Sequence, residues 1–229
     1  DVVILSLDYS QIELRMLAHI ADIKVLQEIF HEGQDIHRAT ASRVFHVPFD
    51  EVTDEMRRRA KAVNFGIVYG ISPYGLSNQL NISTKEASEL ISQFKETFQG
   101  IDEFQKSAIE HARENGYITT ILNRRRYLKD INSSNRALRQ FSERAAVNAI
   151  IQGSAADLIK VAMIRCEEAL QNYQCKLILQ IHDELLFKVP VSELEEVRAV
   201  LIDCMDNALK LKVPLKVDGS AKKTWYEAH

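Results

Sequence analysis

Strand-like patterns stand only near the two ends of this chain, and the long stretch between them is patterned as helices. An apolar run at Val2–Leu7 predicts a strand that passes directly into a helix at Gln11–Ala21. Near the other end, Lys176–Ile181 and Glu184–Val189 are strand-like runs separated by two polar residues, which predicts a tight hairpin. The order of strand, helices, hairpin, helix and strand is typical of an α+β fold with an antiparallel sheet and a large helical insertion.

Capping residues mark the ends of several predicted helices. Thr53 is a suitable N-cap for a helix that runs through Tyr69, and Gly116 is a suitable C-terminal cap for a helix at Ile101–Asn115. A basic turn is expected at Arg124–Arg126. The remaining predicted elements are helices at Asp35–Phe45, Thr84–Phe98, Asn135–Asn172 (with a kink at Gly153) and Ser192–Leu211, and a last strand at Leu215–Val217.

Composition places the chain among globular proteins with a real core, since 46% of its 229 residues are hydrophobic and 27% are charged. No apolar run approaches the roughly 20 residues of a membrane-spanning helix, so no membrane partner is expected. The three cysteines, Cys166, Cys175 and Cys204, lack C-x-x-C spacing, which favours reduced structural thiols in a cytoplasm. A strand that begins at Val2 without an initiating Met suggests a piece cut from a longer protein.

The charge is unevenly distributed along the chain although the net charge is only −3. Between Arg113 and Arg144 there are eight basic and three acidic residues, whereas Asp183–Asp206 has two basic and seven acidic residues. The first segment is suited to contact phosphate groups and the second to hold cations.

Three short constellations carry polar groups suited to chemistry. Asp8 stands where the first strand meets the first helix, a position that suits a metal ligand, although a plain helix cap gives the same pattern. His182-Asp183-Glu184 occupies the predicted hairpin tip, where adjacent carboxylates need a cation or solvent, although a plain polar turn gives the same pattern.

The third constellation is a row of side chains spaced four apart on one predicted helix, which places two cations and two aromatic rings along one face: Arg57, Lys61, Phe65 and Tyr69. A triphosphate beside the cations, with its sugar and base against the rings, would fit this face. A basic surface that turns into a core stripe is the alternative. Gly66 in the helix interior costs roughly 1 kcal/mol and needs a packing or ligand reason.

Taken together, these segments resemble motifs A, B and C of family A DNA polymerases, the bacterial DNA polymerase I group. The matching segments are D-Y-S-Q-I-E-L-R, R-R-R-A-K-A-V-N-F-G-I-V-Y-G and H-D-E. Three more segments resemble the same family in the same order: D-I-H-R-A-T-A, Q-G-S-A-A-D and the ending W-Y-E-A-H. The resemblance spans essentially the whole chain.

The resemblance implies a role for individual residues. It assigns two Mg²⁺ ions to Asp8 and Asp183, with the Tyr9 carbonyl as a further ligand and Glu184 as a supporting catalytic carboxylate. Lys61 is implied as the catalytic proton donor to pyrophosphate. The residues implied to contact the incoming dNTP are Gln11, Glu13, His37, Arg57, Lys61, Phe65 and Tyr69. Glu13 is implied to crowd the sugar 2′ position, and Phe65 to discriminate against dideoxynucleotides. Primer-template DNA is assigned to Arg144, Asn148, Gln152 and His182.

The implied fold is the right-hand fold of polymerases without its thumb: an antiparallel palm sheet with a helical fingers insertion. The expected domains are palm at residues 1–13, fingers at 14–145 and palm again at 146–229. The implied protein is a monomeric DNA-directed DNA polymerase of a bacterial cytoplasm, acting in replication or repair. One alternative is an inactive nucleotide- or DNA-binding fragment, because thumb and upstream domains are missing. Another is a single-subunit RNA polymerase, which Glu13 argues against.

Overall fold

The computed structural model describes residues 1–228, which fall into two compact units. One unit combines Asp1–Ile12 with the chain from Ser154 onward, and the other is Glu13–Gly153. The chain therefore leaves the first unit just after the first strand and returns to it within a long helix.

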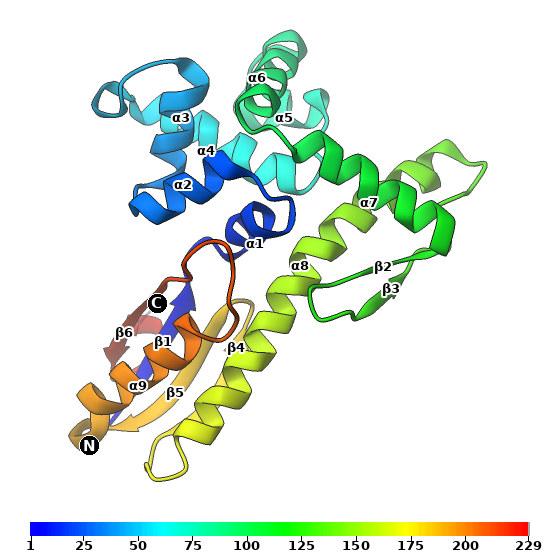
Figure 1. Ribbon diagram of the computed structural model, residues 1–229. Coiled ribbons are helices and arrows are strands. Elements are labelled where there is room, and N and C mark those ends of the chain that lie inside the picture. The colour runs from blue at the N-terminus through cyan, green and yellow to red at the C-terminus, as the bar shows by residue number, and fades with distance from the viewer. Residues whose placement is uncertain (229) are drawn as a thin grey trace. The chain divides into compact units, whose positions relative to one another are not determined.

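The first unit is built on a four-stranded sheet with the order β4-β5-β1-β6 (Figure 1). Each neighbouring pair is antiparallel, which confirms the predicted α+β fold with an antiparallel sheet. Its strands are β1 (Val2–Tyr9), β4 (Lys176–Ile181), β5 (Glu184–Pro190) and β6 (Val217–Lys222).

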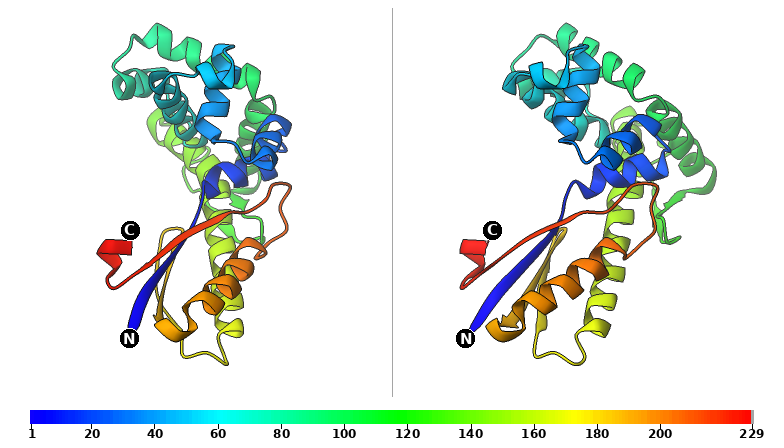
Figure 2. Two further views of the ribbon diagram at one scale, coloured as in Figure 1. Left: turned by 90° about the vertical axis from the view of Figure 1, so that its left-hand side faces the viewer. Right: turned by 60° about the vertical axis from the view of Figure 1, so that its left-hand side comes forward.

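One face of this sheet is apolar and packs against helix α9 (Leu194–Asp206). Leu5, Leu7 and Phe187 are 0% exposed, and along β1 the two leucines alternate with the polar residues Ser6 and Asp8. Tyr9 continues the same alternation, and its hydroxyl donates to the carbonyl of Met205 in α9 at 2.6 Å. Both views of Figure 2 show α9 lying along the sheet. The other face receives the short helix α10 (Trp225–Ala228), which packs against β1 and β6.

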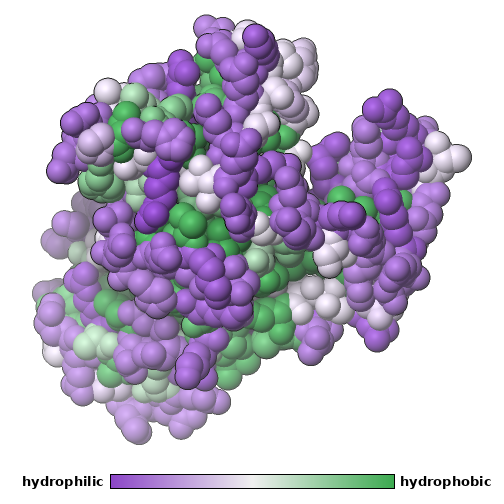
Figure 3. Space-filling model, turned by 45° about the horizontal axis from the view of Figure 1, so that its top comes forward, coloured by the Kyte–Doolittle hydropathy of each residue, from purple (hydrophilic) through white to green (hydrophobic). Residues whose placement is uncertain are grey.

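The second unit is mainly helical. Its helices are α1 (Ile12–Ile20, beginning in the last residue of the first unit), α2 (Lys24–Glu32), α3 (Ile36–Phe45), α4 (Asp54–Val68), α5 (Pro73–Leu80), α6 (Thr84–Thr97) and α7 (Ile101–Asn115). As predicted, the Thr53 side chain accepts the first bond of α4 from the Met56 amide, and Gly116 ends α7 at φ 75°. On the face drawn in Figure 3, the outermost residues are mainly hydrophilic, as expected for helices with one buried side.

The basic segment after α7 is not a simple turn, as the sequence led us to expect, but one strand of a small hairpin. Strand β2 (Tyr117–Thr119) pairs with β3 (Arg125–Tyr127). The guanidinium of Arg125 lies 4.5 Å from the centre of the Tyr117 ring. A cation over an aromatic face is a stabilising contact that local turn propensity does not reveal.

Helix α8 (Arg136–Ala169) is continuous through Gly153. A Cβ on Gly153 would lie 2.6 Å from the methyl group of Thr120, so close packing accounts for the glycine. Contrary to the expectation from the sequence, α8 is long and apolar enough to cross a membrane by length and composition alone. A single helix of this kind is weak evidence for a membrane span, because the core helix of a soluble protein passes the same test; 44% of the most apolar stretch of α8 is buried.

The C-terminal elements differ most from their predicted positions. α9 ends at Asp206 rather than Leu211, because the Asn207 amide group donates to the Asp203 carbonyl at 3.0 Å and caps the last turn. The last strand covers Val217–Lys222 rather than Leu215–Val217, since its pairing with β1 decides where it lies. The helices α2 and α5 were not predicted.

Candidate functional site

The predicted site residues divide between the two units. The first unit holds Asp8, Tyr9, Gln11, His182, Asp183 and Glu184, and the second holds Glu13, His37, Arg57, Lys61, Phe65, Tyr69, Arg144, Asn148 and Gln152. Each set is a separate local constellation with its own geometry.

The carboxylates of motifs A and C lie on adjacent strands. Asp8 in β1 stands directly opposite Glu184 in β5, and the Tyr9 amide donates to the Asp183 carbonyl at 3.2 Å. Asp8 is exposed and Asp183 is half-buried, so solvent reaches both side chains. Strand pairing therefore brings together two acidic residues that are far apart in the sequence.

The tip of the β4–β5 hairpin is held by its own polar groups. His182 has a left-handed backbone at φ 51°, which lets the chain reverse between Ile181 and Glu184. The side-chain amide of Gln180 donates to the His182 carbonyl at 2.6 Å. This turn presents Asp183 beside the end of β1.

Glu184 differs from its neighbour Asp183 because it is buried, with 5% of its surface exposed. Its Oε1 accepts hydrogen bonds from the Ser6 hydroxyl at 2.5 Å and from the Trp225 indole at 3.1 Å. These donors come from β1 and from α10. Glu184 thus ties the hairpin tip to the C-terminal segment, a role that its position in H-D-E does not suggest.

Tyr9 is anchored in the core beneath the carboxylates. Its side chain is 1% exposed, and burial raises the pKa of its hydroxyl above the usual value. The hydrogen bond to Met205 fixes the ring to α9. Since Tyr9 follows Asp8 directly, this anchor also holds the end of β1 in place.

The oxygen donors of this constellation suit a hard divalent cation. Among residues 1–228, no group of three or more His, Cys, Asp or Glu side chains is placed to hold a metal ion by itself. The carboxylates of Asp8 and Asp183 instead suit Mg²⁺, which keeps several waters and is usually shared between one or two carboxylates and substrate phosphates. The residues present are thus compatible with a metal that binds together with its substrate.

In the second unit, helix α4 carries the predicted triphosphate cations. Arg57 donates to both oxygens of Asp35, from Nε at 3.2 Å and from Nη2 at 2.8 Å. Burial acts to raise the pKa of Asp35, but the hydrogen bonds from Arg57 and the Arg38 amide, with the Arg57 charge, lower it below the usual value. Lys61, one turn further along α4, is exposed. We did not predict Asp35, the N-cap of α3, as a site residue, although it begins the D-I-H-R-A-T-A segment that contains His37.

His37 is enclosed beside these cations. Its side chain is 2% exposed, and its ring centre lies 5.6 Å from that of Phe65. Burial lowers the pKa of His37 to about 4, with Arg57 and Lys61 acting in the same direction and Asp35 opposing them. The imidazole is therefore neutral near pH 7.

The end of α4 meets the beginning of α1. The Tyr69 hydroxyl donates to the Glu13 carboxylate, so two residues predicted to lie near the sugar and templating base are in contact. A pocket of about 540 Å³ adjoins them, lined by Phe65, Tyr69, Ile71, Gln79 and Arg144 among others. The glycine in this helix has a packing reason, since a Cβ on Gly66 would lie 2.5 Å from Ile71.

The residues predicted to contact DNA from α8 share one helix face. Arg144, Asn148 and Gln152 are spaced four apart, with Arg144 and Gln152 exposed. The side-chain oxygen of Asn148 is buried without a hydrogen-bond partner among the described residues.

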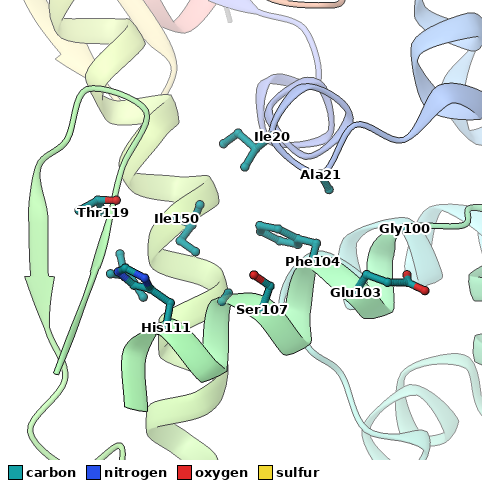
Figure 4. Close-up of a pocket in the computed structure, with 11 residues that line it drawn as sticks. Ile20, Ala21, Gly100, Glu103, Phe104, Ser107, His111, Thr119 and Ile150 are labelled. Atoms are coloured by element: carbon teal, nitrogen blue, oxygen red, sulfur yellow. The ribbon is translucent and has the colours of Figure 1, made fainter. Parts of the chain in front are cut away.

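A further cavity of about 540 Å³ lies between α1, α7, β2 and α8 (Figure 4). The side chains of Ile20, Phe104 and Ile150 point into it, with His111 and Thr119 at its edge. The residues that the sequence predicted for the site do not line this cavity.

The sheet carries paired acidic positions, and the helical unit carries a face of cations and aromatic rings. These are the features that the resemblance to polymerases predicted. The chain belongs to DNA polymerase family A, whose profile matches residues 1–227.

Among curated proteins, the chain is 51% identical to DNA polymerase I of Bacillus caldotenax over 230 aligned residues, covering 100% of this chain and 26% of that protein. It is 52% identical to DNA polymerase I of Streptococcus pneumoniae serotype 4 (strain ATCC BAA-334 / TIGR4), with the same coverage. The chain thus spans about a quarter of the length of these relatives.

The fold also matches a solved structure. The POL domain of Pol1 from M. smegmatis, in complex with DNA primer-template and dNTP, superposes with a TM-score of 0.94 at 46% identity. The match covers 99% of this chain and 40% of that chain.

Proposed function

We propose that this chain is the catalytic part of a template-directed DNA polymerase, a nucleotidyltransferase that adds dNTPs to a primer 3′-hydroxyl in DNA replication or repair. The observation that carries the proposal is the strand pairing that sets Asp8 opposite Glu184 and joins the Tyr9 amide to the Asp183 carbonyl, in a chain of this family. The structural neighbour from M. smegmatis is a complex with DNA primer-template and dNTP, which supports the same substrates.

In this function, Asp8 and Asp183 hold two Mg²⁺ ions together with the Tyr9 carbonyl. Mg²⁺ bound there would supply a lower pKa for the primer hydroxyl and positive charge opposite the leaving pyrophosphate. Glu184 supports the tip through its hydrogen bonds to Ser6 and Trp225.

The nucleotide is held by the cationic and aromatic face of α4. Arg57 and Lys61 contact the triphosphate, and Lys61 donates a proton to the pyrophosphate. The exposed pair between Arg57 and Asp35 leaves the guanidinium free to exchange a carboxylate for a phosphate, since such pairs contribute only about 0–1 kcal/mol. The remaining dNTP contacts are assigned to Gln11, Glu13, His37, Phe65 and Tyr69.

Primer-template DNA is the second partner, contacted by Arg144, Asn148, Gln152 and His182. We assign the palm to residues 1–13 and 146–229 and the fingers to 14–145. The protein acts as a monomer in a bacterial cytoplasm, without a membrane partner. An inactive nucleotide- or DNA-binding fragment is less well supported, because the relatives are polymerases by name and the catalytic residues are present.

Primer extension tests the function directly. The 229-residue chain, a primed template, four dNTPs and Mg²⁺ should give products that follow the template sequence. Chelation of the metal should stop extension, and added Mg²⁺ should restore it. A folded chain that leaves the primer unextended at all Mg²⁺ concentrations would support the inactive-fragment alternative instead.

Substitution of Phe65 by Tyr should increase the use of dideoxynucleotides. The added hydroxyl supplies a polar atom near the sugar, and one hydrogen bond gained there, about 1–1.5 kcal/mol, corresponds to roughly tenfold in relative efficiency. The measurement is the ratio of kcat/KM for ddNTP to that for dNTP. Phe141→Tyr adds the same group at a 65% exposed position and should leave the ratio unchanged. Equal ratios in Phe65→Tyr and wild type would contradict the assignment.

A further inference from the structure

Three buried polar side chains form a chain of hydrogen bonds behind the predicted triphosphate site. Asn64, in α4, is 0% exposed, Thr40, in α3, is 0% exposed, and His37 is 2% exposed. The Asn64 side-chain nitrogen lies 2.9 Å from His37 Nδ1 and 3.2 Å from Thr40 Oγ1. All three belong to the helical unit.

The hydrogen of the Thr40 hydroxyl sets the direction of this chain. Thr40 Oγ1 lies 2.6 Å from the Ile36 carbonyl oxygen. Two oxygens this close must share a hydrogen, so Thr40 donates to Ile36 and can only accept from Asn64. The Asn64 amide must therefore point its NH₂ group, not its oxygen, toward Thr40.

The orientation of the amide in turn sets the tautomer of His37. Both Asn64 hydrogens are used, one on Thr40 Oγ1 and one on His37 Nδ1. His37 Nδ1 must accept and therefore carries no hydrogen in the neutral ring. The hydrogen of the neutral imidazole is placed on Nε2.

Nε2 of His37 is a buried donor without a hydrogen-bond partner among residues 1–228. A buried donor left unpaired costs free energy, and such groups in native proteins call for a functional explanation. The charged groups around the ring are Arg57 and Lys61, with Asp35 paired to Arg57. A phosphate oxygen, which can only accept, would satisfy Nε2 in these surroundings.

We infer that Asn64 is a positioning residue that fixes His37 as a neutral Nε2–H donor for an oxygen of the incoming triphosphate. The inference rests on the proposed function, since it needs a nucleotide beside α4. Without the Asn64 amide, the other tautomer would present a lone pair to the phosphate and repel it. His37 is enclosed in this structure, and the Arg57–Asp35 pair beside it, whose side chains are 39% and 41% exposed, is the contact that the triphosphate would exchange.

The tautomer can be measured without any substitution. Long-range ¹H–¹⁵N correlation spectra of the ¹⁵N-histidine-labelled chain, with His37 assigned from the His37→Gln spectrum, should show Nε2 protonated and Nδ1 unprotonated from pH 6 to pH 9. Protonation at Nδ1, or a ring that titrates near pH 6.5, would overturn the inference.

Asn64→Asp is the matched perturbation, because the side chain keeps its size but can no longer donate. The ring should then place a hydrogen on Nδ1, and Mg²⁺-dATP should bind about 10- to 100-fold more weakly. Asn81→Asp makes the same chemical change at the exposed end of α5 and should bind dATP as the wild type does.

If Asn64→Asp does not fold, Thr40→Val removes the acceptor that orients the amide and should give a mixture of both tautomers. A single Nε2–H tautomer in Thr40→Val would contradict the deduction.

The two proposals fail in different ways. A wild-type chain that binds no dATP at millimolar concentration would contradict the proposed nucleotide site. The tautomer of His37 would still be measured independently of that result. A wild-type chain that binds dATP, with Asn64→Asp binding equally well, would leave the nucleotide site intact and refute the role of Asn64.

Discussion

Asp183→Asn is expected to lower single-nucleotide incorporation by at least about a thousandfold, because it removes several kcal/mol of charge stabilisation and each 1.4 kcal/mol is roughly tenfold in rate. Asp183 lies at the hairpin tip, half-buried and beside the end of β1, so the amide fits without a change in packing. The substitution removes one charge from a pair of carboxylates whose proposed purpose is to hold cations. Rapid-quench kinetics on primed template with Mg²⁺ would measure the loss.

Asp218→Asn is the matched control for this experiment. Asp218 in β6 stands opposite Asp8 on the other side of β1, is exposed, and lies 3.7 Å from Lys216. The same change of charge there should alter incorporation by less than about tenfold, since a surface pair contributes only about 0–1 kcal/mol. Equal losses from Asp183→Asn and Asp218→Asn would mean that general electrostatics, and not metal binding by Asp183, accounts for the effect.

Gly219→Ala should destabilise the sheet unit by about 1–3 kcal/mol, the usual cost of overpacking. A Cβ at this position would lie 2.5 Å from the backbone oxygen of Ser6 and 2.5 Å from a methyl group of Leu7. The backbone oxygen cannot rotate away, so β1 and β6 must separate. For a chain of this size, the melting temperature should fall by about 2–12 °C.

Thermal unfolding followed by circular dichroism would measure this change. Lys222→Ala, an exposed position on the same strand, should stay within about 0.5 kcal/mol of the wild type. Because Leu7 pairs with Gly219 and precedes Asp8, any folded Gly219→Ala protein should also lose incorporation activity. An unchanged melting temperature would show that β1 and β6 accommodate the added methyl group without a loss of stability.

Local patterns predicted the elements whose ends are decided by nearby residues. The N-cap Thr53 and the left-handed Gly116 stand where the sequence placed them, because caps act within one turn of their own helix. The tight hairpin at His182 and Asp183 was also predicted, since two apolar runs with a polar tip leave few other arrangements. The family resemblance, carried by ordered motifs along the chain, is confirmed by the family match.

Elements that depend on a distant partner were predicted poorly. β6 contains Asp218, Gly219 and Ala221, which are residue types depleted in strands, and it exists because β1 offers a neighbouring row of hydrogen-bonding groups. The basic segment at Arg125 becomes a strand for the same reason, through its pairing with β2 and its contact with Tyr117.

By itself, the sequence determined which chemical groups this protein has, their order along the chain and the local caps that begin and end its helices. Tertiary structure alone decided that Glu184 is bound by Ser6 and Trp225, that Arg57 is paired with Asp35, and that the Asn64 amide lies against His37. The physical reason is that a hydrogen bond depends on distance and direction in space. Residues 27 or 178 positions apart acquire these only when helices and strands pack.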